Sequence, residues 1–172
     1  MSELVSKPAA SRTRNRVNGA TSPEQKGHIE LRLWLRMISC SMKMESILSQ
    51  RLRKEFKTSM ARFDVMSQLE RFPDGLIMSE LSRRLVVSNG AITGLVDKLV
   101  EAGLVTRRED PKDRRSMIVR LTRKGRDHFL RMARRHEEWV VSILGELSSA
   151  AQSELLQNLT LLQRNIDMHG KV

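Results

Sequence analysis

The chain has 172 residues and a formal net charge of +11, so it is long enough for one domain with its own core, alone or with an added arm. No apolar run approaches the roughly 20 residues of a membrane span, and the N-terminus shows no secretory pattern. A single cysteine excludes an internal disulfide framework and fits a reducing compartment. These features predict a soluble cytoplasmic protein.

The charge balance is strongly basic, with 31 Lys+Arg against 20 Asp+Glu and a sequence pI near 10.8. Such a balance indicates a polyanionic partner, nucleic acid first and an anionic membrane second; the alternative is a basic surface that only keeps the protein soluble. Aromatic residues make up 3% of the chain, and there is no tyrosine. This composition argues against binding of RNA or single strands by base stacking.

The first half of the chain predicts an arm and two helices. Residues 1–27 are basic and lack any helical or strand period, which indicates a flexible arm that either reaches DNA or is a solvated tail. Residues 28–56 predict one long helix whose apolar stripe needs a large surface to cover it, such as another subunit. Ser59 is the expected N-cap of a second helix over 60–71, and Pro73-Asp74-Gly75 predicts a turn.

Residues 76–121 form the stretch around which the chain is organised. We interpret them as two short helices joined by a tight turn and followed by a two-stranded basic hairpin, which is the layout of a winged helix-turn-helix. Ser79 is the expected N-cap of the first short helix, and Ser88 or Asn89 that of the second. The second short helix has an apolar stripe at helical spacing that we expect to be buried: Ile92, Leu95, Val96 and Leu99. Gly103 stands where the glycine after a helix belongs.

The second half of the chain predicts the hairpin and two further helices. The strand candidates are 104–108 and 116–121. Thr122 is the expected N-cap of a helix that runs to about Glu146, and Ser148 or Ser149 starts a last helix. That last helix repeats apolar residues at the spacing of a coiled-coil-like seam: Leu155, Leu159, Leu162 and Ile166.

The second short helix is the candidate reading helix, meaning the helix that enters the major groove with its N-terminal residues towards base edges. Its polar N-terminal residues are Ser88, Asn89, Gly90 and Thr93. Asparagine pairs bidentately with adenine, and serine and threonine serve either base type. Gly90 and Gly94 keep the exposed face thin, and Arg83, Arg84 and Lys98 are expected to contact phosphates. The alternative is a structural helical hairpin with a polar face.

The tip of the predicted hairpin carries Lys112, Arg114 and Arg115. An arginine on such a tip suits a narrow minor groove with its deep negative potential. The neighbouring Asp113 would hold an arginine in one rotamer and so reduce the entropy lost on binding. The alternative is a solvated charged turn.

A family resemblance rests on two stretches, MSELSRRLVVSNGAITGLVDKLVEAGLVTRR and DPKDRRSMIVRLTRKG. Over about Ile29 to Ile166 the chain resembles the MarR family of winged-helix regulators, with D-x-R on Asp113 and Arg115 and L-T-x-x-G on Leu121, Thr122 and Gly125. The resemblance implies a mainly α fold with a small β-hairpin wing.

By the same resemblance, residues 28–172 form a MarR-type domain, with a winged helix-turn-helix lobe over 60–121 and intertwined dimerisation helices over 28–56 and 122–172. It further implies a homodimer on a palindromic operator, and repression relieved by a small ligand. Arg115 would be the minor-groove arginine and Asp113 its partner, with Arg114 as an adjacent candidate.

A narrower resemblance concerns LRLWLRMISCSMKMESILSQRLRKEF and ARFDVMSQLERFPDGLIMSELSRRL, which are similar to regulators of aromatic-acid catabolism. It implies an aryl-coenzyme A thioester such as hydroxycinnamoyl-CoA as effector. The expected pocket residues are Trp34, Met37, Ile38, Phe63 and Met66, with Arg32 and Arg36 at the CoA phosphates. The alternatives are ordinary core for the apolar residues and a solvated face for the arginines.

Other chemistries find little support in the sequence. Some family members look to sense peroxide through a cysteine held by tyrosines, but this chain has no tyrosine, so we interpret Cys40 as a buried small hydrophobe. The histidines His28, His128, His136 and His169 show no zinc-site spacing, and no catalytic motif is present. We therefore expect no metal, no cofactor and no enzyme activity.

Three functional classes follow from this pattern. The first is a homodimeric, sequence-specific DNA-binding regulator released by a small ligand, which is an aryl-CoA thioester or, as alternatives, a free acid, a drug or a redox signal. The second is a basic architectural protein that binds any duplex. The third is a module that binds another protein through its helical ends.

Overall fold

The computed structural model describes residues 23–111, 113 and 115–170, so most of the predicted arm, together with Lys112 and Arg114, lies outside the described residues. Contacts divide the chain into two compact units, Met1–Met42 and Lys43–Val172, which are described separately.

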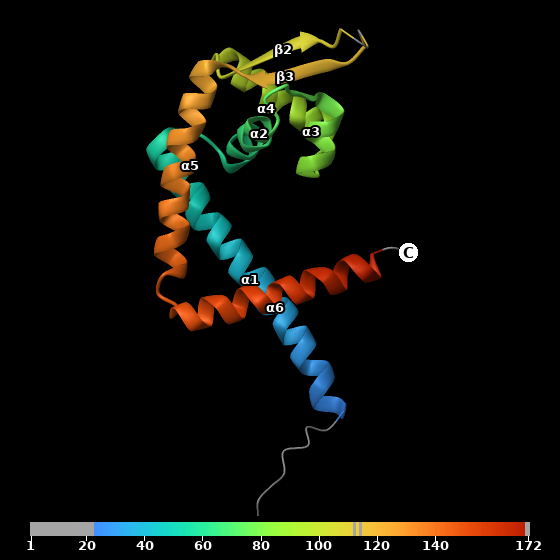
Figure 1. Ribbon diagram of the computed structural model, residues 1–172, viewed down its shortest axis with the longest axis vertical. Coiled ribbons are helices and arrows are strands. Elements are labelled where there is room, and N and C mark those ends of the chain that lie inside the picture. Colours follow the sequence, from blue (N-terminus) through green and yellow to red (C-terminus); the bar gives the residue numbers. More distant parts are fainter. Residues whose placement is uncertain (1–22, 112, 114, 171–172) are drawn as a thin grey trace, which may run out of the picture. The chain divides into compact units, whose positions relative to one another are not determined.

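The elements in chain order are α1 Pro23–Phe56, α2 Met60–Arg71, β1 Leu76–Ile77, α3 Met78–Leu85, α4 Asn89–Glu101, β2 Val105–Glu109, β3 Met117–Leu121, α5 Arg123–Leu144 and α6 Ser149–His169 (Figure 1). The predicted fold class, mainly α with a small β wing, is confirmed.

The first helix begins earlier than the sequence predicts. It starts at Pro23 and not at His28. Proline suits the first turn of a helix because its φ is already helical and its missing N–H would have no partner there. Within the first unit α1 exposes apolar side chains over much of its surface, including Ile29, Leu33 and Trp34, each more than half exposed.

The hydrophobic core of the second unit draws on the last turns of α1 and on α2, α3, α4, β3 and α5. Its fully buried side chains are Leu52, Val65, Met66, Leu69, Leu81, Ile92, Val96, Leu99, Val119 and Met132. The predicted stripe of α4 is confirmed, because Ile92, Val96 and Leu99 are buried and Leu95 packs against them. Since α2 contacts α3, α4 and α5, it is the central element onto which the helix-turn-helix folds.

Hydroxyl caps at helix N-termini confirm most of the predicted boundaries. Ser59, Ser88, Thr122 and Ser148 each accept a hydrogen bond from the backbone N–H three residues on. The predicted Ser79 cap is wrong. The N-cap of α3 is Ile77, without a side-chain hydrogen bond, because Leu76 and Ile77 pair as a strand and the helix follows directly from it. Ser79 therefore lies inside the first turn of α3.

The small sheet has three antiparallel strands in the order β1-β3-β2, one more than the predicted hairpin. In β2 and β3, Val105 pairs with Leu121 and Glu109 with Met117, which gives the predicted wing; β1 adds the pair Leu76–Val119. The predicted turn before β1 is confirmed by Gly75, whose φ is +88°. A Cβ at this position would lie 2.7 Å from the Val119 carbonyl oxygen, so the turn requires glycine.

The L-T-x-x-G motif joins the end of α4 to the start of α5. The Thr122 hydroxyl donates to the Gly103 carbonyl at 2.9 Å and accepts from the Gly125 N–H at 2.9 Å. The Lys124 ammonium donates to the Ala102 carbonyl at 2.9 Å. A Cβ on Gly125 would lie 1.8 Å from the Leu104 carbonyl oxygen. The motif therefore lets the backbone of α5 touch the backbone that follows α4.

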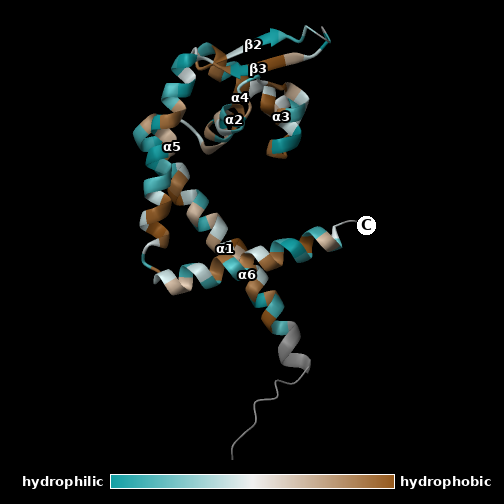
Figure 2. Ribbon diagram, in the orientation of Figure 1, coloured by the Kyte–Doolittle hydropathy of each residue, from teal (hydrophilic) through white to brown (hydrophobic). Residues whose placement is uncertain are grey.

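The C-terminal helices differ in burial. Helix α5 buries Phe129, Met132 and Trp139, and it ends at Leu144 and not at the predicted Glu146. No residue of α6 is buried in the single chain, and the seam residues Leu155, Leu159 and Ile166 are 44–54% exposed. Figure 2 shows hydrophobic residues along both α1 and α6. Apolar stripes of this size need a partner surface.

Candidate nucleic-acid interface

The turn between α3 and α4 is fixed by Ser82. Helix α3 ends at Leu85, and its C-cap Val86 has a left-handed backbone with φ 53° and ψ 44°. The Val87 N–H donates to the Ser82 carbonyl at 3.1 Å, while the Ser82 hydroxyl donates to the Val87 carbonyl at 2.6 Å. Ser82 is 8% exposed. This buried clamp sets the angle between the two helices, and no sequence pattern had indicated it.

The polar start of α4 is open to solvent. Ser88, Asn89, Gly90 and Thr93 are all exposed. The Ser88 hydroxyl is occupied by the cap, and the Thr93 hydroxyl donates to the Asn89 carbonyl at 2.8 Å. The Asn89 side-chain amide has no hydrogen-bond partner among the described residues, so its donor and acceptor are both available to a ligand.

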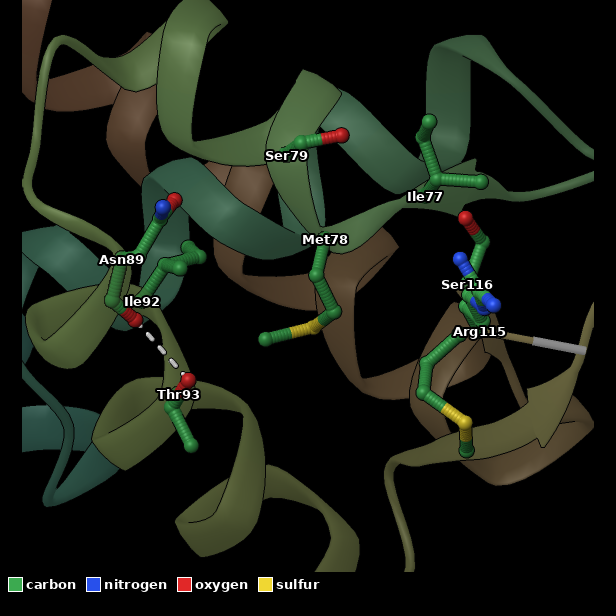
Figure 3. Close-up of a pocket in the computed structure, with 9 residues that line it drawn as sticks. Ile77, Met78, Ser79, Asn89, Ile92, Thr93, Arg115 and Ser116 are labelled. Carbon is green, nitrogen blue, oxygen red and sulfur yellow. Dashed lines mark hydrogen bonds between the residues drawn. The ribbon is translucent and has the colours of Figure 1, made fainter.

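The start of α4 meets the wing across a cavity of about 250 Å³. Its lining residues are Ile77, Met78, Ser79, Asn89, Ile92, Thr93, Arg115, Ser116 and Met117 (Figure 3). In that view the α4 residues and the wing residues lie on opposite sides of the Met78 side chain. One cavity is thus lined by Asn89 and Thr93, predicted for the reading helix, and by Arg115, predicted for the wing tip.

Two glycines on α4 have no packing reason inside the protein. A Cβ built on Gly90 or Gly94 meets nothing within 4 Å. Glycine inside a helix costs about 1 kcal/mol relative to alanine. Packing among the described residues therefore does not explain the two glycines, and the helix backbone is left uncovered at both positions.

Asp113 shapes the wing tip through backbone and hydroxyl contacts. Its carboxylate accepts from the Ser116 hydroxyl at 2.7 Å and from the Arg115 N–H at 3.0 Å, and these two bonds lower the pKa of Asp113. Among the described contacts none joins this carboxylate to the Arg115 guanidinium. The predicted role of Asp113 in holding an arginine rotamer is therefore not supported for Arg115, because the carboxylate is occupied by the turn itself.

The predicted phosphate contacts lie on α3 and α4. Arg83 and Arg84 both bind the Glu80 carboxylate, and hydrogen bonds from Arg83 are the largest cause of the lowered pKa of Glu80. Lys98 is exposed. A further ion pair joins Arg107 of β2 to Asp97 of α4 at 2.8 Å, so the wing and the reading helix are tied together. Sequence reasoning missed this pair because its members are not neighbours in the chain.

The predicted effector residues fall into the two units. In the first unit Arg32, Trp34 and Arg36 are exposed, and Met37 and Ile38 are half-buried. In the second unit Phe63 and Met66 are core residues, 8% and 1% exposed. The Phe63 ring stacks on His136 at 4.8 Å between centroids, and burial lowers the pKa of His136. The effector pocket stays a prediction.

The sequence also led to predictions for Cys40, for metal binding and for membrane spans. Cys40 is exposed on the single chain, so its predicted burial is wrong: its position on α1 falls on a face that stays open to solvent. Among residues 23–111, 113 and 115–170, no group of three His, Cys, Asp or Glu side chains lies close enough to hold a metal ion. In the same part of the chain no helix is long and apolar enough to cross a membrane.

Comparison with known proteins decides the family. Residues 58–116 match the MarR family. A MarR family transcriptional regulator from Silicibacter pomeroyi is 31% identical, with a TM-score of 0.67 over 84% of this chain and 98% of that one. This chain belongs to the MarR family. Like the family it joins, it is a sequence-specific DNA-binding transcriptional regulator.

Two further relatives agree with this assignment. The regulator YkoM of Bacillus subtilis, an uncharacterized HTH-type transcriptional regulator, is 30% identical over 122 residues, which is 70% of this chain and 78% of YkoM. The regulator Sco3205 from Streptomyces coelicolor, solved in complex with DNA, has a TM-score of 0.69 over 81% of this chain and 88% of its own, at 20% identity. That level of identity shows the shared fold. In a helix-turn-helix the second helix of the motif enters the major groove. In this MarR-family chain that helix is α4.

Proposed function

We propose that this MarR-family regulator is a homodimer that binds a palindromic operator through α4 and the wing. We further propose that it represses genes of aromatic-compound catabolism until an aryl-CoA thioester releases it. The observation that carries the DNA-binding part is the start of α4, where the Asn89 amide has no hydrogen-bond partner among the described residues and Gly90 and Gly94 leave the backbone open. The wing lies across a shared cavity from this face.

The dimer is supported by the exposed stripes of the terminal helices. The seam residues of α6 and several apolar residues of α1 are uncovered in the single chain. A two-fold axis would place two α4 helices at half-sites one helical turn apart, roughly 34–36 Å. Selection of bound sequences from a random duplex library tests this arrangement. We expect an enriched palindrome with that spacing, whereas enrichment of no sequence would contradict it.

The two α4 glycines give a prediction in which stability and binding move in opposite directions. Alanine at Gly90 or Gly94 should leave the fold intact or stabilise it by up to about 1 kcal/mol, because the helix gains propensity and the methyl meets nothing. The same methyl groups should weaken operator binding several-fold, since they hold DNA away from the backbone.

Thermal unfolding and fluorescence anisotropy with the selected operator measure these two effects. The control is Glu101→Ala, an alanine substitution at the exposed last residue of the same helix. Unchanged operator affinity in both glycine variants would show that α4 does not approach DNA by this face.

The effector part of the proposal rests on the resemblance of the first two helices to regulators of aromatic-acid catabolism. A CoA thioester carries several negative charges, and the protein is strongly basic, with a net charge of +11. Binding of this anion and of DNA would oppose each other through charge, and by linkage each would lower affinity for the other.

We expect hydroxycinnamoyl-CoA to lower operator affinity, with little effect from the free acid. Titration of each compound into the protein–operator complex, with CoA alone as the control, measures this difference. Equal potency of thioester and free acid would favour a free-acid effector, and no effect of either would favour a drug or redox signal.

A further inference from the structure

Glu80, in the first turn of α3, binds the two arginines that follow it on the helix. Its carboxylate accepts three hydrogen bonds from Arg83, with N–O distances of 2.7–3.0 Å, and pairs with Nε of Arg84 at 2.6 Å. Residues three and four positions apart share one helix face, which explains how one carboxylate reaches both. Two of the cations expected to contact phosphates are therefore occupied in the free protein.

The two arginines are held to different degrees. The Arg84 guanidinium also lies 4.3 Å from the centroid of the Phe72 ring, and its side chain is 32% exposed. The Arg83 side chain is 72% exposed, and Glu80 is its partner among the described contacts. Arg84 is thus held by two contacts, with Glu80 and with the Phe72 ring. Among the described contacts Arg83 is held by Glu80 alone, so loss of that one contact releases it.

Arg83 lies four residues after Ser79 on α3. Ser79, one turn earlier on the same helix face, lines the cavity shared with Asn89 and Arg115. DNA phosphates are strong acceptors for an arginine fork, so DNA bound at this surface would compete with Glu80 for the same N–H groups. The local charges of Arg83 and Arg84 keep Glu80 ionised, as the lowered pKa of Glu80 indicates.

We propose that Glu80 competes with DNA phosphates for Arg83 and so limits the sequence-independent affinity of the protein for DNA. Phosphate contacts supply affinity for any sequence, whereas base contacts supply discrimination. By holding Arg83, Glu80 lowers the sequence-independent part of binding and leaves operator preference to the start of α4. This inference rests on the proposed contact of α3 and α4 with DNA.

The test compares Glu80→Gln, Arg83→Gln and the double variant on the selected operator and on a random duplex of equal length, by fluorescence anisotropy over a salt series. Glutamine keeps the size of the side chain and removes its charge. Glu80→Gln should bind the random duplex roughly 2- to 5-fold more tightly, as expected for release of an exposed ion pair. The slope of log affinity against log salt should steepen by about 0.9 for each Arg83 released. The operator should gain by a similar factor, because a phosphate contact adds affinity for any sequence.

Two controls separate this role from a general charge effect. Glu101→Gln makes the same change in net charge at the far, exposed end of α4 and should leave both affinities unchanged. In the Arg83→Gln background Glu80→Gln should produce no gain. A gain that persists without Arg83, or no gain in the single variant, overturns the inference. Equal binding of operator and random duplex by the unmodified protein would instead overturn the proposed function.

Discussion

Replacement of Gly125 by alanine should destabilise the DNA-binding unit by about 3 kcal/mol or more, at the upper end of the range for overpacking a tight contact. The added Cβ would lie 1.8 Å from the Leu104 carbonyl oxygen, which is backbone and cannot move aside as a side chain would. The start of α5 would have to shift, and the hydrogen bonds of Thr122 to Gly103 and Gly125 would be lost with it.

Thermal or urea unfolding followed by circular dichroism measures this loss, and a fall in Tm of roughly 10 °C corresponds to it for a domain of this size. Gly90→Ala is the matched control, because its Cβ meets nothing within 4 Å and should cause no loss. A loss of less than about 1 kcal/mol for Gly125→Ala would show that the α4–α5 joint tolerates a shift of the α5 start.

The second large effect is expected at Asn89. Alanine at this position should weaken operator binding by about 1–3 kcal/mol per half-site, roughly 5- to 150-fold, while binding to random DNA stays nearly constant. The side-chain amide is exposed and has no partner among the described residues, so the variant loses a base contact and no internal bond. Anisotropy on operator and random duplexes measures both affinities.

Lys98→Ala is the comparison for this experiment. Lys98 is exposed on the same helix and is expected to contact phosphate, so its removal should weaken operator and random DNA by a similar factor. If Asn89→Ala also weakened both duplexes equally, Asn89 would be a backbone contact, and the reading role would pass to other residues of α4.

Local signals predicted much of this fold. The serine and threonine caps were predictable because a hydroxyl before a helix accepts a free backbone N–H, and Ser59, Ser88, Thr122 and Ser148 all do so. The buried stripe of α4 followed from its helical spacing. The same rules predicted the exposed polar start of α4 and the wing that lies beside it.

What the sequence did not reveal depends on contacts between distant residues. Strand β1 has two residues, too few for any period, and exists because β3 pairs with it; this pairing is also why Ser79 does not cap α3. The Ser82–Val87 clamp and the Arg107–Asp97 pair depend on the folded turn and on the sheet. The exposure of Cys40 depends on what covers α1, which a residue's apolar neighbours in sequence do not determine.

The central claim is that base contacts from α4, and not the net charge of +11 alone, determine where this protein binds. The most direct measurement is the ratio of affinities for the selected operator and for random duplex DNA, taken at several salt concentrations. A sequence-specific regulator should prefer the operator by about 10³-fold or more at physiological salt, with both affinities falling steeply as salt rises. Equal affinity for both duplexes at every salt concentration would contradict the account and identify a basic architectural protein.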